Sequence, residues 1–451
     1  MLNRKNIYLI FALILSFSLL PYLSFAKSFS LNLKSAYDFR SARFKDIRTN
    51  DVDHDFFQYI TFKSEGYGLE NLETYANGRI ERDIDGTGIK DYFRDVRDTY
   101  SGDDRISDIY SIWANFKNVL GIFDSKIGRQ YFYGAELAHF DGASIDFNKS
   151  NLFNLSLFGG RRVSLRYHPR KKGIWGGNFD LTINEKTLFE ARFVKYLDFS
   201  YDFAFHQNVT RNLDLSLKYA LINNDPRNVS AEFDYFFPKL SSNIKISYFR
   251  LLGGSNADDY DFDYTSSSNR GKEGYDVARL NIGDLDPYEE LSILWNQPLF
   301  KKFALEASLT IHDLLNNNEG DQYNSDFLEF TAGLNCRDIM LEGNDIFVEW
   351  RHYKDERSSK RFETESNEVR GQYSQMLGNN ISVSAGTFYR FYDYNRNVYQ
   401  TYGFSTEIRG EVTKRISYLV AYSYEEDDEL AVPFSKLDYL QGVRVELEFN
   451  F

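Results

Sequence analysis

The chain has 451 residues and a formal net charge of −13, an acidic balance that argues against nucleic-acid binding, which needs a basic surface. Its single cysteine, Cys336, excludes an intramolecular disulfide and any cysteine-based metal or haem motif. Aromatic residues make up 17% of the chain and only 7 residues are proline, a composition that favours strands. Beyond the N-terminal segment no run of about 20 apolar residues occurs, which excludes a helical membrane protein.

The N-terminus has the pattern of a secretory signal. Arg4 and Lys5 precede an apolar stretch over residues 7–23, and a Ser-Phe-Ala cleavage motif follows it. We expect residues 1–26 to be a signal peptide that is cleaved, which leaves residues 27–451 as a single domain. A retained membrane anchor is the alternative.

The rest of the chain alternates apolar and polar residues in segments of about ten. Clear examples are residues 213–221, 303–311 and 443–451. A period of two places each set on one face of a strand. Strands in soluble sandwiches are usually shorter, whereas segments of this length fit a tilted membrane crossing.

The connections between these segments are alternately short and long. The short turns fall near residues 66–71, 118–121, 148–151, 208–212, 299–302, 377–380 and 412–415, and the long loops span residues 41–54, 83–104, 162–173, 253–286, 314–325, 354–363 and 425–435. This asymmetry is typical of outer-membrane barrels, with short periplasmic turns and long extracellular loops. We therefore predict an all-β fold, a closed antiparallel transmembrane β-barrel. Segments 142–147 and 227–236 are weak, so the expected strand number is even and lies between about 18 and 22.

The last strand ends on an aromatic residue, Phe451, on the apolar parity. This resembles the C-terminal assembly signal of outer-membrane proteins in general. We therefore expect a location in the bacterial outer membrane. The expected partners are outer-membrane lipid and lipopolysaccharide, the barrel assembly machinery and a hydrophilic solute.

Charged residues occupy the other face of the predicted strands and would line the pore. On four strands an acidic and a basic residue lie two positions apart: Glu190 and Arg192, Glu349 and Arg351, Glu368 and Arg370, Glu407 and Arg409. Arg79 and Lys126 share this parity. Such residues would set the selectivity of a hydrated passage, although charges on facing strands also pair for structural reasons alone. The mixture of signs argues against a strongly anion-selective lumen. Residues 253–286 are the longest candidate for an inward-folded plug.

No catalytic or cofactor-binding motif is evident. The sequence lacks G-x-S-x-G, H-E-x-x-H and P-loop patterns. His54, His139 and His312 lie within two residues of an aspartate, the pairing that a barrel hydrolase would need. We expect no catalytic residue, no metal site and no cofactor. Three acidic clusters in the predicted outer loops could collect Ca²⁺ or form a solvated rim: residues 51–55, 258–263 and 425–429.

Three motifs occur in an order that a known family shares. Residues 126–130 (Lys-Ile-Gly-Arg-Gln) are followed by a polar loop, then by residues 140–143 (Phe-Asp-Gly-Ala) and 157–162 (Leu-Phe-Gly-Gly-Arg-Arg). This order resembles the alginate-export type of outer-membrane porin. The resemblance implies that Arg129 and Arg161 lie near the pore. That family's exporter has an arginine-rich lumen, which this sequence lacks, so the substrate is left open.

Arg129 conflicts with strict alternation. Counted from Ile127 it would face lipid, where an arginine at the bilayer midplane costs about 2–4 kcal/mol. We therefore expect a bulge near Gly128 that turns Arg129 inward.

These features predict a channel that passes hydrophilic solutes, such as oligo- or polysaccharides or organic anions, by passive diffusion. The first alternative is a structural barrel sheath that holds a periplasmic or electron-transfer partner. The second is a barrel hydrolase.

Overall fold

The computed structural model describes residues 28–44, 50–66, 69–84, 105–147, 152–163, 173–196, 199–252, 287–315, 325–355, 363–394, 397–427, 431–432 and 435–451. The predicted signal peptide and the candidate plug at residues 253–286 lie outside these ranges. Among the described residues, no helix is long and apolar enough to cross a membrane.

The described chain consists of strands joined by turns. The strands are β1 (Ser28–Phe44), β2 (Asn50–Glu65), β3 (Leu72–Asp83), β4 (Arg105–Val119), β5 (Phe123–Tyr133), β6 (Leu137–Phe147), β7 (Phe153–Arg162), β8 (Gly173–Asn184), β9 (Thr187–Lys195), β10 (Phe199–Thr210), β11 (Leu213–Ile222), β12 (Asp225–Phe237), β13 (Ser242–Leu251), β14 (Tyr288–Phe300), β15 (Phe303–Leu314), β16 (Phe327–Arg337), β17 (Asn344–Asp355), β18 (Glu363–Leu377), β19 (Ile381–Tyr394), β20 (Asn397–Thr413), β21 (Ile416–Asp427), β22 (Ala431–Val432) and β23 (Ser435–Asn450).

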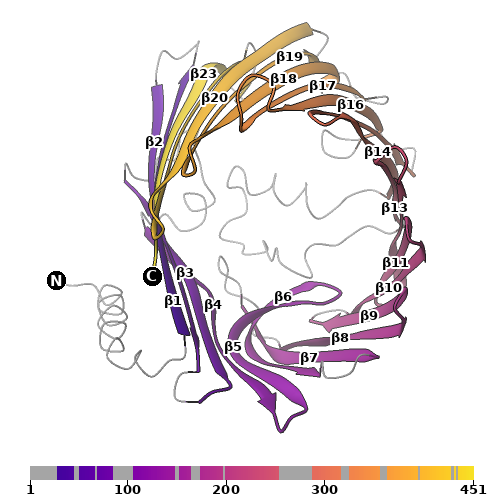
Figure 1. Ribbon diagram of the computed structural model, residues 1–451. Helices are drawn as coiled ribbons and strands as arrows, with labels where there is room; N and C mark the ends of the chain where they lie inside the picture. Colours follow the sequence, from indigo (N-terminus) through magenta and orange to yellow (C-terminus); the bar gives the residue numbers. More distant parts are fainter. Residues whose placement is uncertain are drawn as a thin grey trace, which may run out of the picture.

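These strands close into one antiparallel barrel (Figure 1). From β1 to β21 each strand pairs with the next along the chain, and β21 pairs with β23. The barrel closes where β1 pairs with β23, from Asn32 opposite Asn450 to Phe44 opposite Leu437. The two-residue β22 pairs only with the start of β23, so the wall has 22 strands, β1–β21 and β23. The predicted fold is confirmed, at the upper end of the expected strand number. The two weak segments lie in full strands, β6 and β12.

The two rims of the barrel differ as the sequence predicts. The turn rim, which holds the start of β1 and the end of β23, has connections as short as residues 185–186 and 301–302. The opposite rim, here called the loop rim, holds the connections over residues 84–104 and 252–287. Some loop-rim connections are nevertheless short. β11 and β12, for example, are joined by two asparagines whose φ angles are both positive, 51° and 72°, the backbone that a two-residue hairpin requires.

The position of β6 distinguishes the inner face of the wall from the outer face. Figure 1 shows β6 inside the ring formed by the other strands. A segment there contacts only the inner face, and residues directly opposite each other on paired strands share a face. Followed strand by strand, this register places Leu215 and Leu217 of β11 outside and Asp214 and Lys218 inside. The outer face is apolar and exposed, as a surface that meets lipid must be.

We predict that Leu215→Arg lowers the yield of folded barrel, because it places a guanidinium on the outer face at a cost of about 2–4 kcal/mol near a bilayer midplane. Ser247→Arg is the matched control, since Ser247 lies on the inner face opposite Glu232. The measurement is the heat-modifiable fraction on a gel after refolding into lipid vesicles. Equal yields for the two variants would contradict the assignment of faces.

Candidate functional site

The end of the β5–β6 hairpin leaves the wall and folds into the lumen. Pairing of β5 with β4 stops at Arg129 and pairing of β6 with β7 stops at Phe140, whereas β5 and β6 stay paired up to Tyr133 opposite Leu137. Residues 130–140 therefore form a two-stranded arm, here called the lumenal hairpin. Its backbone reaches β8, where Asn178 Nδ2 donates a hydrogen bond to the Tyr133 carbonyl oxygen at 2.7 Å.

Three glycines allow the strands to approach closely where the lumenal hairpin leaves the wall. Gly128, Gly142 and Gly160 lie opposite one another on β5, β6 and β7. A Cβ atom on them would lie 2.2–2.4 Å from a neighbouring carbonyl oxygen, so no side chain fits. Gly128 also has a φ of +132°, which other residues rarely adopt. Glycine at such a place permits a tight bend of the sheet.

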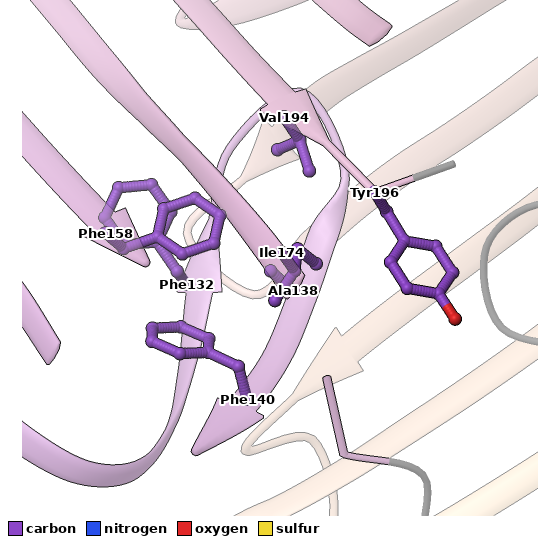
Figure 2. Packing of buried hydrophobic residues seen from close by; sticks show 7 residues of the cluster. All are labelled: Phe132, Ala138, Phe140, Phe158, Ile174, Val194 and Tyr196. Atoms are coloured by element: carbon purple, nitrogen blue, oxygen red, sulfur yellow. The ribbon is translucent and has the colours of Figure 1, made fainter. Parts of the chain in front are cut away.

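An apolar cluster holds the lumenal hairpin against the inner wall (Figure 2). The ring of Phe158 on β7 lies 4.3 Å from that of Phe132 and 4.9 Å from that of Phe140, measured between centroids. Ile174 of β8 and Val194 of β9 complete the contact, and Phe140 is fully buried. Burial of a phenylalanine stabilises by about 1.5–3 kcal/mol, so these rings supply the main attraction.

Polar contacts secure both ends of the same arm. Near its base the Ser144 hydroxyl donates to Gln130 Oε1 at 3.0 Å, and both side chains are buried. At the tip, Glu136 forms an ion pair with Arg227 of β12, so the arm spans the inner surface from β5 to β12. Burial raises the pKa of the Glu136 carboxyl above its ordinary value, and the Arg227 guanidinium opposes this rise.

The fold of the arm reverses which side chains meet the lumen. Phe132 and Ala138 point to the wall, so the alternate residues point away from it. Of these, Tyr133 is 73% and Leu137 50% exposed. Sequence reasoning missed this arm. The available signals were the row of glycines and aromatic residues on both faces of one short segment.

The inner face carries most of the predicted pore-lining residues. Of the twelve basic and acidic positions named from the sequence, ten have inner-face register: Arg79, Lys126, Glu190, Arg192, Glu349, Arg351, Glu368, Arg370, Glu407 and Arg409. Their part in conduction stays a prediction.

Three of the four predicted pairs form within their own strand. The nitrogen–oxygen distances are 2.8 Å in Glu190–Arg192, 2.5 Å in Glu368–Arg370 and 3.0 Å in Glu407–Arg409. The fourth pair is exchanged across strands. Glu349 lies 3.3 Å from the guanidinium of Arg370 on β18. The guanidinium of Arg351 on β17 lies 2.6 Å from Glu329 on β16.

Arg129 and Arg161 do not lie on the inner face, and this corrects the expectation drawn from the family resemblance. The β5–β6 register runs without a shift, so the expected bulge at Gly128 is absent. Strict alternation leaves both arginines on the face of Ile127, which is outside. Asp141 lies between them, and Arg129 binds it through two hydrogen bonds, Nε to Oδ1 at 2.8 Å and Nη2 to Oδ2 at 3.0 Å.

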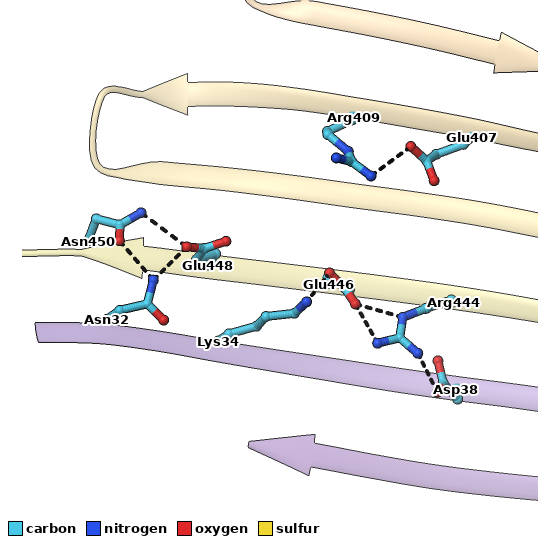
Figure 3. A network of polar contacts seen from close by, with 9 residues as sticks. All are labelled: Asn32, Lys34, Asp38, Glu407, Arg409, Arg444, Glu446, Glu448 and Asn450. Atoms are coloured by element: carbon cyan, nitrogen blue, oxygen red, sulfur yellow. Dashed lines mark hydrogen bonds and ion pairs between the residues drawn. The ribbon is translucent and has the colours of Figure 1, made fainter. Parts of the chain in front are cut away.

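The seam that closes the barrel carries a network of charges on its inner face (Figure 3). Glu446 of β23 accepts from Lys34 of β1 and from Arg444, both at 2.6 Å. Arg444 in turn reaches Asp38 of β1 at 2.9 Å. These contacts cross the junction between the first and the last strand, so they have a structural role whatever passes through the lumen.

The inner wall of β9–β13 has a recess of about 310 Å³. His206 Nδ1 lies 2.9 Å from the Ser216 hydroxyl and Nε2 lies 3.2 Å from Glu190 Oε2, a serine–histidine–carboxylate arrangement. Ser216 lies within β11, which pairs with β10 and β12. The backbone N–H groups around it therefore donate hydrogen bonds to these neighbouring strands. A serine hydrolase needs such donors for its oxyanion. The arrangement therefore fits a hydrogen-bond network better than a catalytic site.

Strand alternation separates His54 and His312 from their aspartate neighbours, whereas His139 and Asp141 share one face of β6. His54 lies on the outer face, with Nδ1 2.6 Å from the Tyr37 hydroxyl, whereas its aspartate neighbours lie inside. His312 lies on the inner face, 3.3 Å from Glu290, and Asp313 lies outside.

The acidic clusters noted in the sequence fall in different places. Asp53 and Asp55 belong to β2 and pair with Arg40, residues 258–263 lie outside the described ranges, and residues 425–427 end β21. In the described part of the chain no group of three or more His, Cys, Asp or Glu side chains is arranged to hold a metal ion.

Carboxylates face one another on the inner wall from β5 to β12. Asp124 lies opposite Asp146, and Asp214 lies opposite Asp234. Within the described residues no lysine or arginine lies in ion-pair distance of these four. Like charges directly opposite each other destabilise a sheet, and in a lumen they create a negative potential that favours cations.

Comparison with known proteins gives only distant likenesses. No family model matches the sequence, and no curated protein matches it. The structure is similar to that of OccAB3 from Acinetobacter baumannii, with 12% identity, a TM-score of 0.44 and coverage of 94% of this chain and 99% of that one. It is also similar to OccAB2 from Acinetobacter baumannii, with 10% identity, a TM-score of 0.47 and coverage of 95% of this chain and 99% of that one. A third similar structure is OpdK from Pseudomonas aeruginosa with vanillate, with 11% identity, a TM-score of 0.43 and the same two coverages. The alginate-export resemblance stays a prediction.

We predict that Phe140→Ala loosens the lumenal hairpin without opening the wall, because the lost ring packs the arm against Phe158 while the strand pairing of the wall is made by the backbone. Truncation of a buried phenylalanine costs about 3–5 kcal/mol. Amide hydrogen exchange should rise in residues 130–140 and stay unchanged in β14–β21. Phe179→Ala on the outer face is the control. Unchanged exchange in the arm would contradict the role of the cluster.

Proposed function

We propose that this protein is an outer-membrane channel through which hydrophilic solutes diffuse passively. One observation carries the proposal: a closed 22-strand wall with an exposed apolar outer face and a charged inner face. Only helices and closed barrels satisfy every backbone group inside lipid, which supports membrane insertion. Barrels of 16–18 strands already leave an aqueous channel, so this wall has room for a passage beside the lumenal hairpin.

The lumenal hairpin acts as the constriction of that channel. It occupies the inner surface from β5 to β12 and is anchored at both ends, by the apolar cluster and by the Glu136–Arg227 ion pair. Solutes then pass between the exposed side of the arm, which carries Tyr133 and Leu137, and the inner wall opposite. The candidate solutes remain those that a polar lumen admits: oligosaccharides, polysaccharides and organic anions, together with cations.

Single-channel recording tests the proposal. The purified, refolded chain in a planar phosphatidylcholine bilayer should give steady open conductance in 1 M-range salt, and a candidate solute that binds in the lumen should block it. A stably folded but silent barrel would overturn the channel and favour a barrel filled by a partner.

We predict that shortening the lumenal hairpin raises the single-channel conductance, because it removes the arm from the passage. In the variant, residues 131–139 are replaced by Asn-Gly, a sequence that closes a two-residue turn. The control shortens the turn at residues 338–343 on the turn rim. Equal conductance of variant, control and wild type would show that the constriction lies elsewhere.

We also predict that the open channel prefers cations. Asp214→Asn combined with Asp234→Asn removes two facing carboxylates and should move the reversal potential in a salt gradient toward zero. Asp313→Asn changes the same charge on the outer face and serves as the control. A reversal potential that the double variant leaves unchanged would remove these carboxylates from the permeation path.

A further inference from the structure

The outer face at the loop rim over β5–β10 carries three basic residues, Arg129, Arg161 and Lys195. Arg129, Asp141 and Arg161 lie side by side on β5, β6 and β7. Two residues further from the loop rim along β8, Trp175 lies opposite Lys195 of β9. Cations on an outer face are unusual in a barrel, because that face meets hydrocarbon over most of its height.

The rows below these three residues are apolar. Ile145 lies opposite Leu157, and Phe193 opposite Tyr201, all with outer-face register. Charge at the rim therefore gives way to aliphatic and aromatic side chains within about 13 Å, the length of four strand residues. This is the profile of a membrane interface, where the headgroups of the lipid begin.

Arg161 is available for a ligand at this level. Its side chain is exposed, and within the described residues it forms no hydrogen bond or ion pair. Asp141 lies opposite it and interacts with its charge, but the hydrogen bonds of Asp141 go to Arg129. Lys195 lies two strands away on β9, with its ammonium 4.4 Å from the centroid of the Phe199 ring. Trp175, between them on β8, is 48% exposed.

The charge over β5–β10 differs from that over β14, β15 and β21, although Arg82 of β3 and Arg105 of β4 also lie opposite each other on the outer face. On β14, β15 and β21 the outer face near the loop rim carries acidic residues, Glu289, Asp313 and Glu426. The sequence that joins β7 to β8, residues 164–172, contains four lysines and arginines and no acidic residue.

We propose that Arg161 and Lys195 bind a phosphate group of the phosphorylated glycolipid of the outer leaflet, lipopolysaccharide. The inference rests on the proposed placement in the outer membrane. A guanidinium offers a phosphate two parallel hydrogen bonds and the ammonium adds a point charge. Trp175 and Phe199 then lie beside the upper part of the acyl chains, since aromatic rings suit the level of the headgroups.

The test measures binding of lipid A to the detergent-purified full chain by native mass spectrometry. The wild type should retain bis-phosphorylated lipid A at least ten times more strongly than dephosphorylated lipid A, and salt should weaken the binding. Arg161→Gln combined with Lys195→Gln should lose most of this difference. The matched control, Arg211→Gln with Lys301→Gln, removes two exposed cations from the turn rim and should bind as the wild type does.

Several outcomes overturn the inference. Equal retention of the two lipids by the wild type would do so even if the double variant failed to fold. Retention by a folded double variant equal to that of the control would also do so. Conductance in phosphatidylcholine bilayers is recorded in parallel. A conducting barrel without lipid A selectivity refutes the lipid site alone, whereas a silent barrel with selective binding refutes the channel alone.

Discussion

The whole structure depends on the pairing of every strand edge. In a sheet that meets hydrocarbon, an unpaired N–H or C=O has no water to bind, so the first strand must meet the last. Here β1 and β23 pair over most of their length, and Lys34, Asp38, Arg444 and Glu446 link them on the inner face. Once the seam is closed, alternation divides the side chains into an inner and an outer set.

The lumenal hairpin departs from this rule at a defined place. Between Gly128 and the loop rim, β5 and β6 stay paired with each other but no longer pair with β4 and β7. The backbone hydrogen bonds that would have joined these residues to β4 and β7 are replaced by burial of Phe132 and Phe140 and by the ion pair of Glu136 with Arg227. The lumenal hairpin therefore narrows the lumen, and the regular hydrogen bonds between its two strands keep it stiff.

The face on which a charge lies decides what it can do. Glu190 and Arg192 lie inside, where they form an ion pair along β9. Arg161 has the same chemistry as Arg192 but lies outside, at the level where apolar rows end. A shift of one residue in register thus decides whether a charged side chain faces the lumen or the outside of the barrel.

The sequence by itself determined the barrel, the two kinds of rim and the inner-face register of ten of the twelve named charges, because a period of two and the turn residues are local properties of the chain. Even the outward parity of Arg129 could be counted from Ile127, and the expected bulge was an unnecessary correction to it. Only the tertiary structure decided the strand number, the exchange of partners by Glu349 and the inward fold of residues 130–140. These depend on which strands lie opposite one another and on contacts such as Phe140 with Phe158, between residues that no local pattern relates.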